Sequence, residues 1–228
     1  MTENQIASDI ENIASSGSLP VDFKIERSQI SYWINQTRSM LVSQDIQKRK
    51  DISDVWIQTI SCQDLEQVDK SECCEIETGC TILKSPILPR TIEVNGTNSI
   101  IRVTDMMGNK IDKTTYAEVS VDGHNKFTSK KPKWYLKNDR IYVINSDFLS
   151  KINIDLLAEN PSDLAAYATC DGSTCYSINS DYPCSLKMAS EITNIVLKTK
   201  VYPFLQLPQD TTNNADNQPN QQPNTRRL

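Results

Sequence analysis

The spacing of the apolar residues changes twice along this chain of 228 residues. Up to about residue 50 they recur at helical intervals, between residues 55 and 157 they lie in short runs broken by turn residues, and from residue 188 helical spacing returns. A helix repeats about every 3.6 residues and a strand about every second residue, so this pattern predicts helices at both ends of a β-rich middle. We therefore expect an α+β fold: a small helical bundle, with two N-terminal helices and one C-terminal helix, and an inserted antiparallel β-domain.

Two helices are expected within the first 50 residues, and Thr2 can cap the first one before Gly17 and Pro20 end it. The apolar positions of this helix are Ile6, Ile10 and Ile13. The second helix fits residues 28–48, with Ser28 as its cap and cations in its last turn, where the helix dipole favours them. Its apolar stripe consists of Ile30, Trp33, Ile34, Thr37 and Leu41, with Met40 beside it. Two such stripes facing each other would bury the tryptophan between the helices.

Short runs of strand-like residues follow, separated by residues that favour turns. The runs lie at residues 55–62, 81–84, 91–94, 99–103, 116–121, 134–136, 140–144 and 152–157. The turn dipeptides are Asn95-Gly96, Gly108-Asn109, Asp122-Gly123 and Asn138-Asp139. The clearest hairpin is the one at Asn138-Asp139, between the runs at 134–136 and 140–144. Because no helical segment separates the runs, we expect a compact antiparallel domain and no parallel sheet.

The last part of the chain returns to helix and then loses its apolar residues. A single turn can start at Pro161, and a longer helix can begin near Pro183 and pack on the two N-terminal helices. The stripe of this helix consists of Met188, Ile192, Ile195, Val196 and Thr199. Residues 208–228 hold almost no apolar side chains, so we expect a C-terminal arm that is disordered in the monomer or ordered by a partner. The expected parts are residues 1–50 (N-terminal helices), 51–160 (inserted β-domain), 161–207 (return segment and C-terminal helix) and 208–228 (polar arm).

No motif of catalysis or of cofactor binding occurs in the sequence. The single histidine, His124, lies in a turn, and there is no phosphate loop, dinucleotide fingerprint or nucleophile elbow. The net charge of -5 gives no reason to expect broad binding of nucleic acid, and the lysines within residues 126–137 are expected to lie on a solvated loop. No run of apolar residues is long enough to cross a membrane, and the first residues lack a signal peptide, so we expect a cytoplasmic origin. We therefore expect a structural protein and not an enzyme, with no catalytic residues, no cofactor and no metal.

Seven cysteines form two clusters, with one cysteine apart. The clusters are Cys73, Cys74 and Cys80, then Cys170, Cys175 and Cys184, and Cys62 stands apart. No pair has the spacing of a zinc knuckle, and an odd number of cysteines without a secretion signal argues against a disulfide framework. We favour buried free thiols, because unpaired cysteine is a small and commonly buried apolar residue. A metal site and functional disulfides stay open as alternatives.

Several short segments, spread over most of residues 28–200, carry a resemblance to a known family. They are residues 30–50, residues 61–66 (SCQDLE), residues 68–70 (VDK), Cys73 and Cys74 with Gly79 and Cys80, residues 89–93 (PRTIE), Cys170-Asp171-Gly172 with Cys175, and Asp181-Tyr182-Pro183. Together these segments resemble the ring proteins that stack beneath the portal in crAss-like bacteriophages.

The resemblance implies a head–tail connector: a ring of copies, twelve to match a portal, that joins the capsid portal to the tail and continues the channel through which genomic DNA passes without specific binding. It also implies a place in the virion at the portal vertex, after assembly in the cytoplasm of the host bacterium. The implied partners are further copies of this chain, the portal protein, and other ring or tail proteins, with no membrane involved. Terminal arms in such proteins reach onto the portal. Carried over to this chain, that partner interface would consist of Tyr202, Phe204, Leu205, Leu207, Arg226 and Arg227.

Three other functions stay open at this point. A different station in the virion, such as another ring or a component of the tail hub, would keep the same class of protein. A secreted binding module would use the β-domain for recognition and would pair its cysteines, but the sequence shows no export signal. An enzyme with an unrecognised pair of carboxylates is the third alternative.

Overall fold

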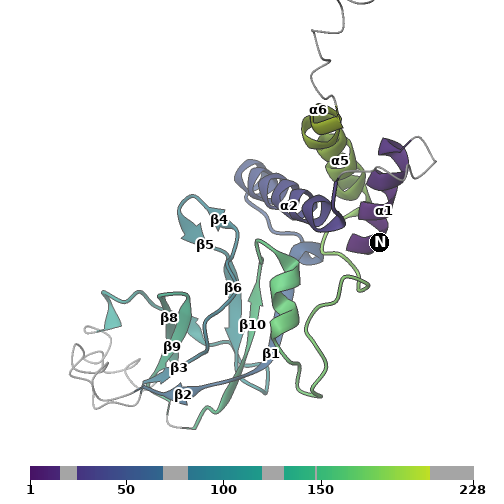
Figure 1. Ribbon diagram of the computed structural model, residues 1–228. Helices are drawn as coiled ribbons and strands as arrows, with labels where there is room; N and C mark the ends of the chain where they lie inside the picture. Colours follow the sequence, from purple (N-terminus) through teal and green to yellow (C-terminus); the bar gives the residue numbers. More distant parts are fainter. Residues whose placement is uncertain (16–24, 69–81, 120–130, 147, 206–228) are drawn as a thin grey trace, which may run out of the picture.

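The computed structural model describes residues 1–15, 25–68, 82–119, 131–146 and 148–205. Its helices gather in one lobe and its strands in another, and the chain passes from the helical lobe into the strands and back (Figure 1). The helices are α1 (Glu3–Ala14), α2 (Arg27–Arg49), α5 (Leu186–Val196) and the short α6 (Tyr202–Leu205). Helix α5 packs on both α1 and α2. The α+β class is therefore confirmed, with helices from both ends of the chain in one bundle.

The strand lobe contains two sheets and one separate hairpin. The strands are β1 (Gln58–Asp64), β2 (Glu66–Gln67), β3 (Leu83–Lys84), β4 (Glu93–Val94), β5 (Thr97–Asn98), β6 (Ile100–Thr104), β7 (Asp112–Lys113), β8 (Lys133–Lys137), β9 (Arg140–Ile144) and β10 (Lys151–Leu156). One sheet has the order β1-β10-β6, the other has the order β2-β3-β9-β8-β7, and β4 pairs with β5. All pairs are antiparallel except β7 with β8, which run parallel. The expectation of a purely antiparallel domain is wrong at this pair. Residues 114–132 connect the two strands, and a connection of this length is long enough for the crossover that a parallel pair requires.

Helix α1 begins with the cap that the sequence predicts. The Gln5 amide donates to the hydroxyl of Thr2 (3.2 Å), and the Thr2 amide donates to the side-chain oxygen of Gln5 (2.9 Å). This reciprocal pair satisfies two amide groups that the helix itself leaves without a partner. Ile6 and Ile10 are buried as expected, but Ile13 is 49% exposed, because the last turn of α1 extends past the bundle's core.

Replacing Thr2 by alanine is expected to lower the free energy of unfolding by about 1 kcal/mol, because the Gln5 amide loses its acceptor. Urea unfolding of Thr2→Ala beside the wild type measures the difference. Ser31→Ala is the matched control, since the Ser31 hydroxyl makes no hydrogen bond within the part of the chain that the structure describes. Equal losses of stability in the two variants would contradict the capping role.

Helix α2 confirms the predicted apolar stripe and corrects its start. Ile30, Trp33, Ile34, Thr37 and Leu41 are all buried, whereas Met40 is 45% exposed. The N-cap is Glu26 and not Ser28, and no side chain caps the helix. The Ser28 hydroxyl instead donates to the carboxylate of Glu26 at 3.2 Å, inside the first turn. Arg38, on the same stripe, is completely buried.

Two of the predicted strands differ from the structure. The run at 55–62 starts as a short 3-10 turn, η1 (Asp54–Trp56), which leaves Val55 52% exposed, and β1 begins only at Gln58. The run at 116–121 is not a strand where it is described, because residues 116–118 form a turn. The Glu118 amide donates to the Thr115 carbonyl (3.0 Å), and the Thr115 amide donates to the Glu118 carboxylate (3.2 Å). These local bonds satisfy the backbone that a strand would have to pair.

Two predicted hairpins are confirmed, and their turns have the expected backbone. Asn138 and Asp139 join β8 to β9 with φ angles of 51° and 56°, and Asn95 and Gly96 join β4 to β5 with φ angles of 53° and 73°. Left-handed φ at both central residues matches the right-handed twist of the strands, and asparagine, aspartate and glycine reach it at low cost. The dipeptide Asp122-Gly123 lies outside the described residues.

Helix α5 begins at Ser185, whose hydroxyl accepts a bond from the Met188 amide (3.2 Å). Met188, Ile192 and Val196 are buried as predicted, but Ile195 is only partly buried and Thr199 is exposed. A π-helical turn, η3 (Leu197–Val201), follows Val196 directly. Its wider turn rotates the next residues around the helix axis, so the buried face continues through Leu197 and Val201 instead of Thr199.

One continuous hydrophobic core runs through both lobes. It includes Ile6 and Ile34 of the helices together with Ile60 and Ile154 of the first sheet. A smaller cluster lies in the second sheet, around Tyr135 and its neighbours. The inserted strands thus share their core with the helices, and the two lobes pack as parts of one unit.

Candidate assembly surface

The two lobes are joined by a buried arginine. Arg38 of α2 has no exposed surface, and its guanidinium donates to the carbonyl oxygens of Trp56 (3.4 Å), Ala158 (2.9 Å) and Pro183 (2.9 Å). These carbonyls lie just before β1, just after β10 and just before α5. The guanidinium carbon also lies 5.8 Å from the centre of the Tyr182 ring, within the range of a cation–π contact. Arg38 therefore holds three separate segments against one helix.

A buried carboxylate of α1 completes the same junction. Glu3 is 1% exposed and accepts hydrogen bonds from the Tyr176 hydroxyl (2.9 Å), the Ser162 hydroxyl (3.2 Å) and the Asn35 amide group (3.3 Å). The Tyr182 hydroxyl donates to the side-chain oxygen of Asn35 at 2.7 Å. The network thus links α1, α2, the 3-10 turn η2 (Pro161–Ala166) and the segment before α5.

Burial shifts the pKa values of the two tyrosines in this junction in the direction that preserves their hydrogen bonds. Desolvation raises the pKa of Tyr182 well above its usual value, and desolvation with the nearby Glu3 charge raises the pKa of Tyr176. Both hydroxyls therefore keep the protons that they donate. Desolvation lowers the pKa of Arg38, while Tyr182 and Glu3 oppose that change. The arrangement stabilises the contact between the lobes through satisfied buried polar groups.

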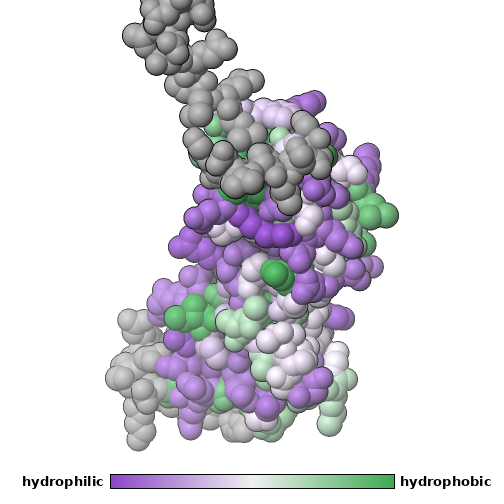
Figure 2. Space-filling view, turned by 45° about the vertical axis from the view of Figure 1, so that its right-hand side comes forward, coloured by the Kyte–Doolittle hydropathy of each residue, from purple (hydrophilic) through white to green (hydrophobic). Residues whose placement is uncertain are grey.

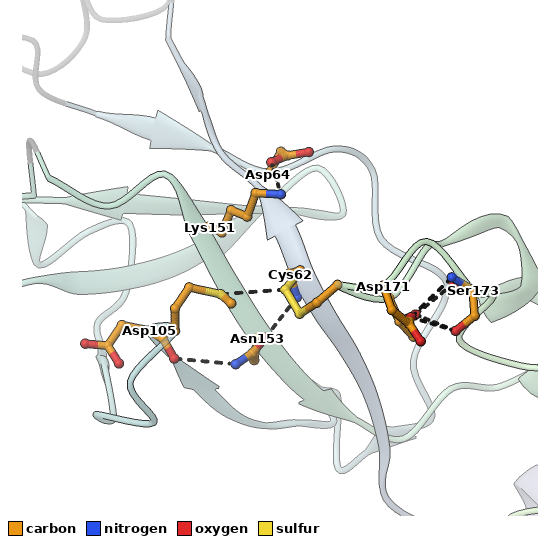
Figure 3. The surroundings of a disulfide bond; sticks show 10 residues. Cys62, Asp64, Asp105, Lys151, Asn153, Asp171 and Ser173 are labelled. Carbon is orange, nitrogen blue, oxygen red and sulfur yellow. Dashed lines mark hydrogen bonds and ion pairs between the residues drawn. A yellow bond between two sulfur atoms is a disulfide. The ribbon is translucent and has the colours of Figure 1, made fainter.

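A disulfide between Cys62 and Cys170 ties the long return segment to strand β1 (Figure 3). The two residues are 108 positions apart in sequence, and their Cα atoms lie 5.1 Å apart. Cys62 has a φ of 55° within a bulge of β1, and its amide donates to the side-chain oxygen of Asn153 on β10 (2.9 Å). The expectation of free thiols is therefore wrong for this pair, because the fold brings together two cysteines that the sequence places in separate groups.

A tight turn presents Cys170 to the strand. The Thr169 amide donates to the Ser173 carbonyl (2.7 Å), and the Asp171 carboxylate accepts bonds from the Thr169 hydroxyl, the Ser173 hydroxyl and the Ser173 amide. The Thr169 and Ser173 bonds lower the pKa of Asp171 to about 2. The turn therefore keeps an ionised carboxylate, and its hydrogen bonds, throughout the neutral and mildly acidic range.

The other cysteines and the single histidine are the remaining residues that could bind a metal or react. Cys175 and Cys184 are free thiols, as predicted, but they are only partly buried and not fully buried as expected. Cys73, Cys74, Cys80 and His124 lie outside the described residues. Among the residues that are described, no group of three or more histidine, cysteine, aspartate or glutamate side chains could hold a metal ion.

The lysine run at 126–137 is described only from Lys131 onward. Lys131 is exposed, but the ammonium group of Lys137 lies 4.2 Å from the centre of the Tyr116 ring. The prediction of a solvated loop is therefore wrong for Lys133 and Lys137, which begin and end strand β8, and Lys137 packs on an aromatic side chain of the neighbouring turn.

The predicted interface residues begin at the outer end of the helical lobe, where α6 lies (Figure 1). Tyr202 and Phe204 of α6 are 41% and 53% exposed, and the rings of Phe204 and Trp33 form an edge-to-face pair with 6.4 Å between their centres. Leu205 is the last residue of α6. Leu207, Arg226 and Arg227 lie outside the described residues. The structure therefore places two of the predicted interface residues together on an exposed helical end.

Other exposed apolar residues are distributed over both lobes, and sequence reasoning did not single them out as contacts. They include Tyr32, Val55, Ile87, Met107, Phe148, Ile178 and Leu186. Figure 2 shows several separate apolar patches on a mostly hydrophilic face.

No helix in the described part of the chain combines the length and the hydropathy needed to cross a membrane.

No curated protein matches the sequence. Residues 5–221 match a family described as phage tail ring protein 2, from the crAss-like phages. The match covers nearly all of the 228 residues, and it confirms the resemblance noted on the short segments. The chain therefore belongs to the phage tail ring protein 2 family and is a structural, ring-forming protein of the virion.

Proposed function

We propose that twelve copies of this chain close into a ring that joins the portal of the capsid to the tail and continues the channel for genomic DNA. The observation that carries this proposal is the match to a ring family over residues 5–221. A closed ring repeats one heterologous interface, so each copy needs two different complementary surfaces. The exposed end of α6 and the separate apolar patches of both lobes supply candidate surfaces for such contacts. We also propose that the ring acts without catalysis, as a connector only.

Residues from Tyr202 onward, including Arg226 and Arg227, would contact the portal in this arrangement. The aromatic side chains of Tyr202 and Phe204 have the size and exposure that central contact residues of an interface require. The DNA channel would use surfaces of the ring that do not bind the genome tightly, in line with the net charge of -5.

The test is co-expression of the chain with the portal protein of the same phage, followed by native mass spectrometry. We expect a discrete complex in which the chain contributes about 310 kDa, twelve times its mass of 25.8 kDa. A chain that stays monomeric at all concentrations, alone and with the portal, would contradict the proposal.

Replacing Phe204 by alanine is expected to weaken binding to the portal about tenfold, because a half-exposed aromatic side chain at an interface contributes about 1 to 2 kcal/mol. Phe148→Ala is the matched control, since Phe148 is 76% exposed on the strand lobe. Surface-immobilised portal rings and purified variants give both dissociation constants. If Phe204→Ala and Phe148→Ala bind the portal with the same dissociation constant, the proposed contact between α6 and the portal is wrong.

The alternative to the portal junction is another position in the virion, within the tail, because the family is described as a phage tail ring protein. In that case the partners are other ring proteins or components of the tail hub, and the portal is not contacted. Pull-down with the tail proteins of the same phage, in parallel with the portal, decides between the two stations.

A further inference from the structure

A cleft of about 570 Å³ opens between the start of β1 and the segment that leads into α5. One wall includes Ile57, Gln58 and Thr59 around the start of β1, and the facing residues, among them Tyr176, Tyr182 and Cys184, belong to the segment before α5. The volume lies within the range of roughly 300 to 1000 Å³ that is usual for binding clefts. Val55 and Leu186, which also line the cleft, are 52% and 72% exposed.

One buried acceptor in this cleft has no donor. Gln58 is only 9% exposed, and its side-chain oxygen makes no hydrogen bond within the described residues. Leaving a buried polar atom unpaired costs about 1 to 3 kcal/mol, so such an atom at a binding cleft indicates a missing donor. The cleft is many times larger than the roughly 30 Å³ that a water molecule occupies, so a larger polar ligand fits there as well.

The wall that contains Gln58 is also a free strand edge. Strand β1 is the end strand of the sheet β1-β10-β6 and pairs only with β10 among the described strands. Gln58 and Thr59, the first residues of β1, line the cleft, so the beginning of this edge borders it. A free edge beside a cleft is the geometry in which an extended peptide adds to a sheet through its backbone.

The chain itself contains a segment of suitable chemistry. Residues 206–228 follow α6, and ten of these 23 residues are asparagine or glutamine, whose amide groups can donate to the Gln58 oxygen. Residues 209–218 lie between two prolines and contain none, so every amide of this stretch can join a ladder, and ten residues exceed the usual strand length of about five. Fully extended, the 13 residues 206–218 reach about 43 Å from the end of α6, so this stretch can enter the cleft of an adjacent copy that lies within that distance.

We propose that, in the assembled ring, residues 209–218 of one copy lie in the β1 cleft of the neighbouring copy and pair with the beginning of β1. This inference rests on the proposed ring. Each copy then donates one arm and receives one, which is the heterologous contact that closure requires. The contact with the portal would then fall to the exposed end of α6 and to the residues beyond 218, with Arg226 and Arg227.

The test is photo-cross-linking in rings that mix two isotopic forms of the chain. Asn213 is replaced by a benzophenone amino acid, and ¹⁵N-labelled and unlabelled copies are assembled together with the portal. We expect cross-linked peptides that join residue 213 to residues 55–59 or 175–186, with one heavy and one light partner in many of them. The same photo-reactive residue at Tyr32, which is exposed on α2, is the control and should not label the cleft.

Each outcome separates this inference from the proposed function. If residue 213 labels only its own copy, or only sites outside the cleft, the proposed exchange of arms between copies is wrong, but the proposed ring is not contradicted. A chain that forms no ring overturns both. In addition, Gln58→Leu should lower the yield of the cross-link about fivefold without lowering the midpoint of unfolding, because the variant removes an unpaired acceptor and keeps the side-chain volume. An unchanged yield would contradict the role of Gln58.

Discussion

Arg38→Ala is expected to lower the free energy of unfolding by about 4 kcal/mol and the melting temperature by about 10 °C. The substitution removes a large, fully buried side chain and leaves the carbonyls of Trp56, Ala158 and Pro183 without their donor. Two terms favour loss of stability: the cavity, at about 2 to 5 kcal/mol, and the unpaired carbonyls, at about 1 kcal/mol or more each. They are partly offset because a buried charge is no longer desolvated and because water can enter the cavity.

The measurement is chemical unfolding followed by circular dichroism, with Arg49→Ala as the control. Arg49 belongs to the same helix but is exposed, so its loss should change the stability by less than about 0.5 kcal/mol. Arg38→Met should lie between the wild type and Arg38→Ala, since methionine fills part of the space but donates no hydrogen bond. A stability of Arg38→Ala within 1 kcal/mol of the wild type would show that the junction does not depend on the guanidinium.

Cys62→Ala is expected to lower the free energy of unfolding by about 3 kcal/mol. The disulfide closes a loop between residues 108 positions apart, and a loop of that length restricts the unfolded chain by about 4 to 5 kcal/mol in the entropy model. Observed values are commonly smaller, near 2 to 4 kcal/mol. The effect should be visible as a lower unfolding midpoint in urea under non-reducing conditions.

A reductant provides the internal control for the disulfide. It should destabilise the wild type to the level of Cys62→Ala and leave Cys62→Ala unchanged. Cys175→Ala, which removes a free thiol of intermediate exposure, should cost less than about 1.5 kcal/mol with or without reductant. A wild type whose stability does not respond to reductant, although alkylation shows the bond broken, would contradict the expected contribution.

Those features of the fold that depend on local pattern could be predicted from the sequence. The cap at Thr2, the stripe of α2 and the hairpin at Asn138-Asp139 each follow from residues within a few positions of one another, where periodicity and turn chemistry act. The turn at 116–118 was predicted as strand, although Thr115 and Glu118 have the spacing of a reciprocal cap and could have indicated it.

The junction and the disulfide could not be predicted in the same way. Arg38 lies four positions after Ile34 and three before Leu41, so helical spacing places it on the buried stripe, but arginine is rarely buried without a known partner. Its partners are backbone carbonyls from three distant segments, and any residue type can supply a carbonyl. The pairing of Cys62 with Cys170 likewise depends on tertiary structure, because spacing alone does not determine which cysteines meet.

The bonds of Glu3 to Ser162 and Tyr176 also affect when the protein can fold during its synthesis. These partners lie 159 and 173 positions later in the chain, so α1 and α2 emerge from the ribosome long before the segments that bury them. Contacts over such distances form slowly, and the early helices expose apolar stripes until then. The helical lobe can therefore close only after residue 201 has been made, which means that a nascent chain cannot present a finished subunit to a growing ring. Assembly would begin from completed chains, and it would respond to the concentration of free subunits in the infected cell.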